Sequence, residues 1–398
     1  MHQDHRHHGA RSRHRRVVVA ALLGCSLTLA AAACAPVPPP GPAACPARTE
    51  VQLEPPDPTA FSYPRAVSPN GEWAVASRVV GADLVLALRP TVAGPAGTPV
   101  GSLAYAAVAA GTLLASVPAD GSQVVFGLAG TASLPTDPQT TLRRWRAASG
   151  TVVDLPVPVV ASPPSGVPYP VNPVRVSADG RRVLWTQSFR EGPEPSVWQR
   201  VLIVTDAATD AVVSTASIDG AEVGWTTGDG AAFLDGNRLV VTATGATTDL
   251  DPTVAAAGAA FPGPQLFVDG ISDDLRYLAL RRYDATTVPG VFTYILWDRS
   301  TATGRIAYQV ATTGQVGQPQ VRLDAVTLAG SLVLTKWASP PDLAELVEAH
   351  PGGAVTVLSA ATVLTPALSW AVTTTDGRTV LASRRGVLGQ ELVAERCS

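Results

Sequence analysis

The histidines of this chain are poorly placed for catalysis or metal binding. Five of the six lie within the first 14 residues, and the sixth, His350, stands in VEAHPGG, a stretch typical of a hairpin turn. Zinc and copper sites need several His or Cys side chains together, and a catalytic triad needs a His beside its nucleophile. G-x-S-x-G, P-loop and G-x-G-x-x-G patterns are also missing from the sequence. The sequence therefore predicts no metal, no cofactor and no His-based catalyst.

Carboxylates are the remaining groups that could do chemistry. Asp249 and Asp251 stand in TTDLDPT, and Asp269, Asp273 and Asp274 stand in VDGISDDL. Neither stretch has the 12-residue spacing of an EF-hand loop, although oxygen ligands of this kind suit calcium. Asp is also a common turn residue. We interpret both stretches as turns, with calcium binding as the alternative.

A repeated turn organises the rest of the chain. SPNGEWAVAS (68–77) is echoed by VPADGSQVVFG (117–127), VSADGRRVLWT (176–186), ISDDLRYLALRR (271–282) and TTDGRTVLAS (374–383). One residue per repeat marks seven units about 50 residues apart: Gly71, Gly121, Gly180, Gly236, Leu275, Gly330 and Gly377. A period of this length is typical of propeller blades.

Each unit has the pattern of a four-stranded antiparallel sheet. The Asp-Gly turn suits a tight hairpin, because Gly adopts positive φ without strain. An apolar strand follows, as in WAVAS (73–77), and then a second apolar run, as in YILWD (294–298). Strands that are apolar on both faces are expected where sheets pack between other sheets. The predicted fold is an all-β, seven-bladed β-propeller.

These turns resemble the TolB-type propeller repeat, a relative of WD-type repeats, whose signature is roughly Ser-Pro-Asp-Gly-basic-x-Ile-Ala-Phe. The closest copies are Ser68-Pro69-Asn70-Gly71, Ser177-Ala178-Asp179-Gly180 and Thr375-Asp376-Gly377. The resemblance covers 58–396 and implies a propeller. It does not imply one function, because this scaffold is used by binding proteins, scaffolds and enzymes.

The N-terminus reads as a bacterial lipoprotein signal. A basic stretch is followed by an apolar run over 17–33 and by Ala31-Ala32-Ala33-Cys34, which resembles a lipobox. Leu22-Leu23-Gly24-Cys25 is the alternative site. We predict a signal peptide at 1–33, a Pro-rich spacer at 34–44 after a lipidated Cys34, and the propeller at 45–398. The protein would then be anchored by lipid at the outer face of the cell membrane.

Charge restricts the partners. Without residues 1–33 the chain carries 24 basic and 31 acidic residues, a formal balance of −7. Nucleic-acid binding needs a basic face, so we expect no nucleic-acid partner. The expected partner is an envelope protein, a peptide or a glycan, bound by a monomer.

The ring should close by pairing the two ends of the chain. The seventh unit is one strand short after QELVAERC (390–397), and RTEVQL (48–53) can supply that strand. In an antiparallel pair, Cys45 would meet Cys397. We therefore predict a Cys45–Cys397 disulfide in an oxidising compartment.

Three long connections are the predicted ligand face. They cover 155–173, 187–198 and 244–265, and they contain Tyr169, Phe189 and Phe261, which we expect to be exposed. The first hypothesis is a recognition or scaffold module and not an enzyme. The alternative is a lactonase- or lyase-like propeller enzyme, which would need three or more carboxylates converging on the central channel.

Overall fold

The computed structural model describes most of the chain beyond its N-terminal region. The described residues are 48–57, 62–92, 97–110, 112–130, 134–137, 139–192, 197–218, 226–287, 289–311, 321–338, 343–362, 371–386 and 389–397. Cys25, Cys34, Cys45 and the predicted spacer therefore lie outside them.

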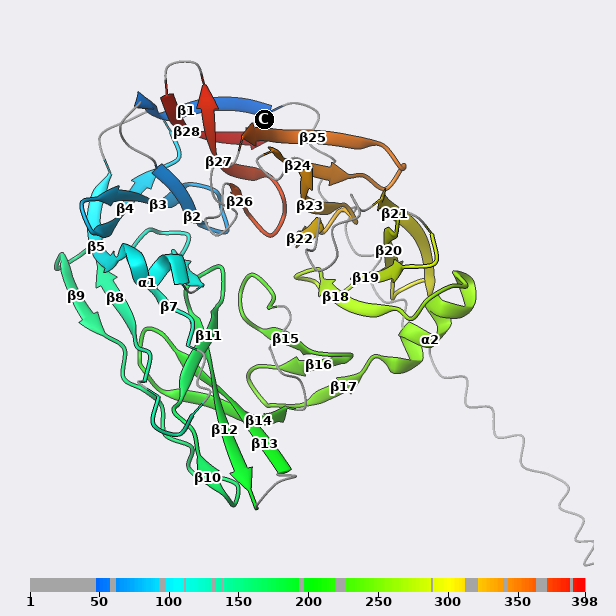
Figure 1. The fold of residues 1–398 in the computed structure, drawn as a ribbon, viewed down its shortest axis with the longest axis horizontal. Helices are drawn as coiled ribbons and strands as arrows, with labels where there is room; N and C mark the ends of the chain where they lie inside the picture. Colours follow the sequence, from blue (N-terminus) through cyan, green and yellow to red (C-terminus); the bar gives the residue numbers. More distant parts are fainter. Residues whose placement is uncertain are drawn as a thin grey trace, which may run out of the picture. The chain divides into compact units, whose positions relative to one another are not determined.

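Seven antiparallel sheets form the blades of a β-propeller (Figure 1). Blade 1 contains β2 (Ser62–Val67), β3 (Trp73–Val80), β4 (Asp83–Pro90) and β5 (Thr98–Ala104), and blade 2 contains β6 (Leu113–Ser116), β7 (Gln123–Leu128), β8 (Leu142–Arg146) and β9 (Thr151–Asp154). Helix α1 (Tyr105–Ala110) connects these two blades. In blade 3, β10 (Val167–Pro168) and β11 (Asn172–Val176) both pair with β12 (Arg182–Glu191), which is followed by β13 (Val197–Asp206) and β14 (Val212–Ile218).

The remaining blades follow in chain order. Blade 4 contains β15 (Ala232–Asp235), β16 (Arg238–Val241) and β17 (Thr247–Asp249), and helix α2 (Asp251–Ala260) follows. Blade 5 contains β18 (Phe267–Ile271), β19 (Tyr277–Asp284), β20 (Val291–Asp298) and β21 (Thr303–Ala311). Blade 6 contains β22 (Val321–Val326), β23 (Leu332–Ala338), β24 (Leu343–Ala349) and β25 (Val355–Thr362). Blade 7 contains β26 (Ala371–Thr373), β27 (Thr379–Gly386) and β28 (Gly389–Cys397), with β1 (Arg48–Asp57) as its outer strand.

The core lies between blades and not within any one of them. Seven clusters of buried apolar side chains each draw on two neighbouring blades, from blades 1 and 2 around to blades 7 and 1. Adjacent residues of one strand serve different clusters: Val124 and Phe126 face blade 1, whereas Val125 faces blade 3. This alternation follows from the two-residue period of a strand. It explains why the strands are apolar on both faces.

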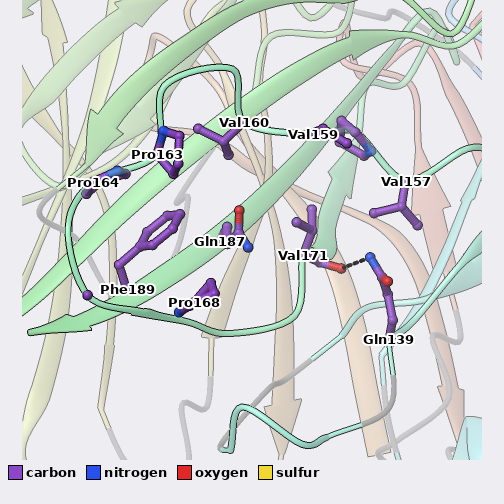
Figure 2. A pocket seen from close by; sticks show the side chains of 12 residues that line it. Gln139, Val157, Val159, Val160, Pro163, Pro164, Pro168, Val171, Gln187 and Phe189 are labelled. Atoms are coloured by element: carbon purple, nitrogen blue, oxygen red, sulfur yellow. Dashed lines mark hydrogen bonds between the residues drawn. The ribbon is translucent and has the colours of Figure 1, made fainter.

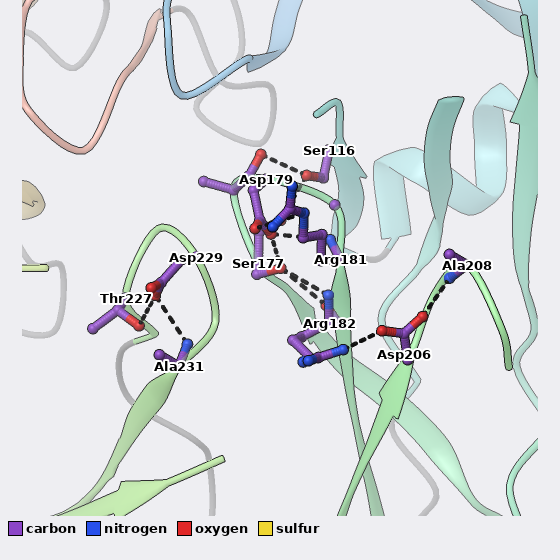
Figure 3. Close-up of polar contacts among 12 residues, drawn as sticks. Ser116, Ser177, Asp179, Arg181, Arg182, Asp206, Ala208, Thr227, Asp229 and Ala231 are labelled. Atoms are coloured by element: carbon purple, nitrogen blue, oxygen red, sulfur yellow. Dashed lines mark hydrogen bonds and ion pairs between the residues drawn. The ribbon is translucent and has the colours of Figure 1, made fainter. Parts of the chain in front are cut away.

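A hydroxyl group holds the repeated turn in shape (Figure 3). In blade 3, Ser177 Oγ donates to Asp179 Oδ1 over 2.6 Å and accepts from the Arg182 amide over 2.9 Å. The Arg181 amide donates to the same Asp179 oxygen. Equivalent hydroxyl contacts recur in four other blades, through Ser68, Thr227, Ser272 and Thr374.

The turn of blade 4 corrects one sequence assignment. Gly236 lies in the next hairpin, between β15 and β16, whereas the repeated turn is Thr227-Gly228-Asp229-Gly230. Both glycines have positive φ, so an Asp followed by Gly does not distinguish the two hairpins. The hydroxyl two residues before the Asp does. With Gly230 as the marker, the units are 45 to 59 residues apart.

Blade 4 has three strands among the residues that the structure describes, because Thr226 contributes an isolated bridge to Phe233 in place of an inner strand. Leu275 takes the place of the turn glycine in blade 5, as the sequence indicated, and it adopts the positive φ of 59° that the turn requires.

The predicted closure of the ring is confirmed. Strand β1 pairs antiparallel with β28, with Arg48 opposite Cys397 and Val51 opposite Ala394 (Figure 1). Cys397 takes part in a disulfide bond. Cys45, three residues before Arg48, is not among the described residues, so its pairing with Cys397 stays a prediction.

The Cys45–Cys397 bond is tested by labelling thiols in the native, non-reduced protein. We expect Cys45 and Cys397 to resist alkylation until reductant is added. Because the bond closes a loop of more than 300 residues, Cys45→Ser should lower the free energy of unfolding, by up to about 5 kcal/mol in the chain-entropy account. Alkylation of both cysteines without reductant would show that this closure is wrong.

Candidate functional site

The innermost strands of the blades surround a cavity of about 250 Å³ at the centre of the ring. Its lining comes from blades 1, 2, 3, 4, 6 and 7. The charged lining residues are Arg65, Arg175, Arg322 and Asp324. The lining residues that the structure describes therefore include three guanidinium groups and one carboxylate.

Bulges in the inner strands place two of these side chains. The pairing register shifts between Pro64 and Ala66 in β2 and between Leu323 and Ala325 in β22, so Arg65 and Asp324 are the extra residues. A bulge bends its strand and redirects a side chain. Arg65 and Asp324 both stand three residues before the hydroxyl residue that begins the turn, Ser68 or Thr327.

Arg65 is a largely buried cation with one unused donor. Its Nε donates to Ser77 Oγ over 2.6 Å, and its guanidinium lies 5.4 Å from the centre of the Tyr63 ring. Its Nη2 is buried and has no hydrogen-bond partner. Burial lowers the pKa of Arg65 to about 10, and the phenols of Tyr63 and Tyr105 oppose this shift only in part. The group stays charged at neutral pH.

Asp324 is engaged by its neighbours. Its carboxylate accepts a hydrogen bond from Arg322 Nε over 2.9 Å and another from Thr335 Oγ1 over 2.5 Å. At the equivalent bulge of blade 5, Asp269 accepts from Tyr294 Oη over 3.1 Å and pairs with Arg281 over 3.4 Å. Burial raises the pKa of Asp269 despite the Arg281 charge. Neither carboxylate is left without a donor.

Turns of three blades meet beside this cavity. The Gly228 amide of blade 4 donates to Asp273 Oδ1 of blade 5 over 2.7 Å, and the hydroxyl of Thr375 in blade 7 also donates to the Asp273 carboxylate. A Cβ at Gly228 would lie 2.8 Å from the Thr375 side chain and 2.9 Å from Asp273 Oδ2, so this contact requires glycine. Burial is the main cause that raises the pKa of Asp273, and the charges of Asp229 and Asp376 add to it.

A second hollow lies beside β12 of blade 3 (Figure 2). This blade 3 groove has a volume of about 470 Å³ and is formed by the segment 157–171 together with Gln139, Gln187 and Phe189. Most of its lining is valine and proline. Gln187 Nε2 donates to the Tyr169 carbonyl over 2.9 Å, and Gln139 Nε2 donates to the Val171 carbonyl over 3.2 Å. Gln187 thus ties the segment to β12, and Gln139 ties it to the chain just before β8 of blade 2.

Exposed apolar side chains surround the blade 3 groove. Val159 is 81% exposed, Val167 53% and Trp198 50%. The Trp198 ring lies 5.0 Å from that of Tyr169, which follows the groove residue Pro168 in the chain. Exposed apolar surface of this kind is favoured where proteins bind partners.

The three aromatic residues predicted to be exposed are not. Tyr169 and Phe189 are buried, because the segment 155–173 folds back on β12, although Phe189 still lines the groove. Phe261 is half-buried and packs with Leu250 and Ala257 against the core between blades 4 and 5. The stretch 244–265 is therefore no free loop, since it contains α2. Whether these aromatic residues contact a ligand stays a prediction.

The other carboxylates chosen from the sequence act as turn residues. Asp249 Oδ1 accepts the Asp251 amide, and Asp274 Oδ1 accepts both the Ser272 hydroxyl and the Arg276 amide. In the part of the chain that the structure describes, no three His, Cys, Asp or Glu side chains form a group that could hold a metal ion. Nor does any described helix have the length and apolar character needed to cross a membrane.

Sequence reasoning missed the arginines of the cavity. Arg65 stands three residues before Ser68, the hydroxyl residue of its turn, and Arg175 stands two residues before Ser177. Most other units have an apolar residue or Asp at these places, and this difference is the one signal that could have identified the two arginines. Recognising it requires the inner strands to be aligned on the hydroxyl residue of each turn.

Comparison with solved structures gives other propellers at low similarity. An oligogalacturonate lyase from Vibrio parahaemolyticus is 10% identical, with a TM-score of 0.47 over 87% of this chain and 93% of that one. TolB from Acinetobacter baumannii is 14% identical, with a TM-score of 0.35 over 86% of this chain and 65% of that one. A puromycin-hydrolysing peptidase from Mycobacterium tuberculosis is 13% identical, with a TM-score of 0.42 over 84% and 51%. No protein-family model and no curated protein matches the sequence. The class of this protein is thus defined by its own structure, a seven-bladed β-propeller.

Asp273→Asn tests the contact between the three turns. The amide keeps an acceptor for Gly228 but carries no charge, and the raised pKa of Asp273 means that its charged form is disfavoured in the folded state. We expect the variant to be more stable than the parent at pH 7. The difference in free energy of unfolding between the variant and the parent should shrink as the pH falls through the folded-state pKa of Asp273. It should vanish below about pH 4, where Asp273 is protonated in the unfolded state as well.

Asp284→Asn is the matched control for this titration, measured by the same denaturant unfolding. Thr286 lowers the pKa of the exposed Asp284, so the sign reverses and this variant should be the less stable one at pH 7. An Asp273→Asn variant that is destabilised equally at pH 7 and pH 4 would show that the charge is not disfavoured.

Proposed function

We propose that this propeller is a recognition module that binds an extended apolar segment of an envelope protein in the blade 3 groove. The observation that carries the proposal is the groove itself, a hollow of about 470 Å³ lined by valine and proline beside exposed Val159 and Trp198. An extended peptide can place alternate side chains in such a hollow. A glycan would need more polar groups than the two glutamines supply, and both glutamines already hold the segment 157–171.

The segment that forms the groove is fixed to the blade, so that little order would have to be gained on binding. Val171, Leu155 and Phe189 belong to the buried cluster between blades 2 and 3. The Tyr169 amide donates to the Ser188 carbonyl over 2.9 Å. A preformed site binds with a smaller entropic cost than a mobile loop.

The enzyme alternative would require carboxylates that converge on the central channel. Among the described lining residues Asp324 is the one carboxylate, and Arg322 and Thr335 engage it. No observation on the described channel favours carboxylate catalysis, so we develop the recognition hypothesis.

We further propose that Cys34 carries a lipid and holds the propeller at the outer face of the cell membrane. The support is the apolar stretch 17–33 that ends at this cysteine and the Pro-rich run behind it. Cys34→Ala should abolish labelling by a fatty-acid probe and release the protein from membranes. Labelling that persists in Cys34→Ala and is lost in Cys25→Ala would assign the lipid to the other cysteine.

The groove hypothesis is tested by panning a random peptide display library on the full chain in detergent. We expect enriched peptides to be rich in aliphatic residues and proline, because the lining offers apolar surface. Val159→Glu and Trp198→Ala should each weaken their binding about tenfold or more, in line with the loss of a buried anchor.

Val357→Glu is the matched control, since Val357 is 54% exposed on β25 of blade 6, away from the groove. Its affinity for the enriched peptides should equal that of the parent. Enriched peptides that bind the Val159→Glu variant and the parent equally would place recognition elsewhere.

A further inference from the structure

The central cavity has charges that the proposed recognition of an apolar peptide does not use. Arg65, Arg175 and Arg322 line it together with Asp324, from blades 1, 3 and 6. Their formal sum is two positive charges, on a chain whose overall formal net charge is −3. This sum covers the described lining residues; the Asp273 carboxylate, which contacts the lining residue Thr375, lies beside the cavity and is engaged by Gly228 and Thr375.

Arg65 is the group that lacks compensation. It is largely buried, its Nε is used by Ser77, and its Nη2 has no hydrogen-bond partner. The groups that favour its charged form are the two phenols of Tyr63 and Tyr105. A buried cation without an anion is costly, so an anion in the cavity that Arg65 lines would offset part of that cost.

The cavity walls restrict what such a ligand can be. The lining also contains small side chains, Ala66, Ala115 and Ala371, and the hydroxyl of Thr226, whereas the Thr373 hydroxyl donates to the Thr379 carbonyl over 3.1 Å. Alanine leaves space, and hydroxyl groups can donate to an oxyanion. A volume of about 250 Å³ accommodates a small molecule and is too small for a folded chain segment of any length.

We propose that the central cavity binds a small oxyanion, a carboxylate or a phosphate, attracted by the charge of the Arg65 guanidinium, with Arg175 and Arg322 adding to the field. Guanidinium groups suit both anions, because their planar donors match two oxygens at once. Asp324 weakens the site, since its charge has the sign of the ligand. This binding is independent of the blade 3 groove.

The proposal is tested by isothermal titration of the full chain in detergent with succinate and, separately, with inorganic phosphate. Ionic strength is held constant with sodium chloride, so that general screening does not count as binding. We expect saturable binding of one equivalent of at least one of the two oxyanions, and the two titrations show which chemistry the cavity takes.

Four variants locate the site. Arg65→Gln should weaken binding about tenfold or more, as expected when a charged donor is lost. Arg65→Lys, which keeps the charge, should weaken oxyanion binding less than Arg65→Gln does. Asp324→Asn should bind several-fold more tightly than the parent. Arg143→Gln is the control, because Arg143 pairs with Asp154 on blade 2 and does not line the cavity.

The outcomes divide cleanly. Saturable binding that Arg65→Gln weakens and Asp324→Asn strengthens supports the proposal, and the Asp324→Asn result alone carries it if Arg65→Gln does not fold. No binding of either oxyanion, or equal affinity in the parent, Asp324→Asn and any folded Arg65 variant, overturns it.

Discussion

The hydrogen bonds of one buried hydroxyl, found in five of the seven repeated turns, are the constraint on which the ring depends. In blade 3, Ser177 ties the side chain of Asp179 to the amide of Arg182 and so fixes where the inner strand ends and the next begins. The same turns then connect blades: Ser116 Oγ donates to the Ser177 carbonyl, and the Asp179 amide donates to the Gly228 carbonyl. A turn of defined shape therefore sets both the hairpin and its contact with the neighbouring blade.

The position of the channel residues follows from this constraint. Each inner strand is anchored at its turn, so a residue counted back from the hydroxyl reaches a defined height in the ring. Bulges at Arg65, Asp269 and Asp324 occur at one such height, three residues before the turn. The carboxylates of Asp269 and Asp324 accept hydrogen bonds from neighbouring side chains, whereas Arg65 Nη2 has no hydrogen-bond partner. The scaffold thus presents a chemical group at the centre without using a loop.

Much of the fold could be predicted from the sequence, because the repeat is local. The hydroxyl, the Asp and the Gly lie within four residues, and the closure by β1 follows from a missing strand. The assignment of Gly236 failed since an Asp-Gly pair also suits an ordinary hairpin. Tyr169 was misplaced because a Pro-rich segment without strand pattern looks exposed, yet here it packs against β12. Phe189 was misplaced because β12 extends to Glu191, into the stretch predicted as a long connection. The site at the centre depends on bulges and on side chains from six blades, which no local pattern records.

A double-mutant cycle at Ser177 and Asp179 tests the central claim most directly. Ser177→Ala, Asp179→Ala and the double variant are unfolded by denaturant, with Asp120→Ala as the comparison, because Pro118 replaces the hydroxyl residue in the turn of blade 2. If the hydroxyl and the carboxylate hold the turn together, the coupling free energy of Ser177 and Asp179 should be about 1 kcal/mol or more. Asp120→Ala should then lower the free energy of unfolding less than Asp179→Ala does. Additive single effects, with equal costs at Asp120 and Asp179, would contradict the account.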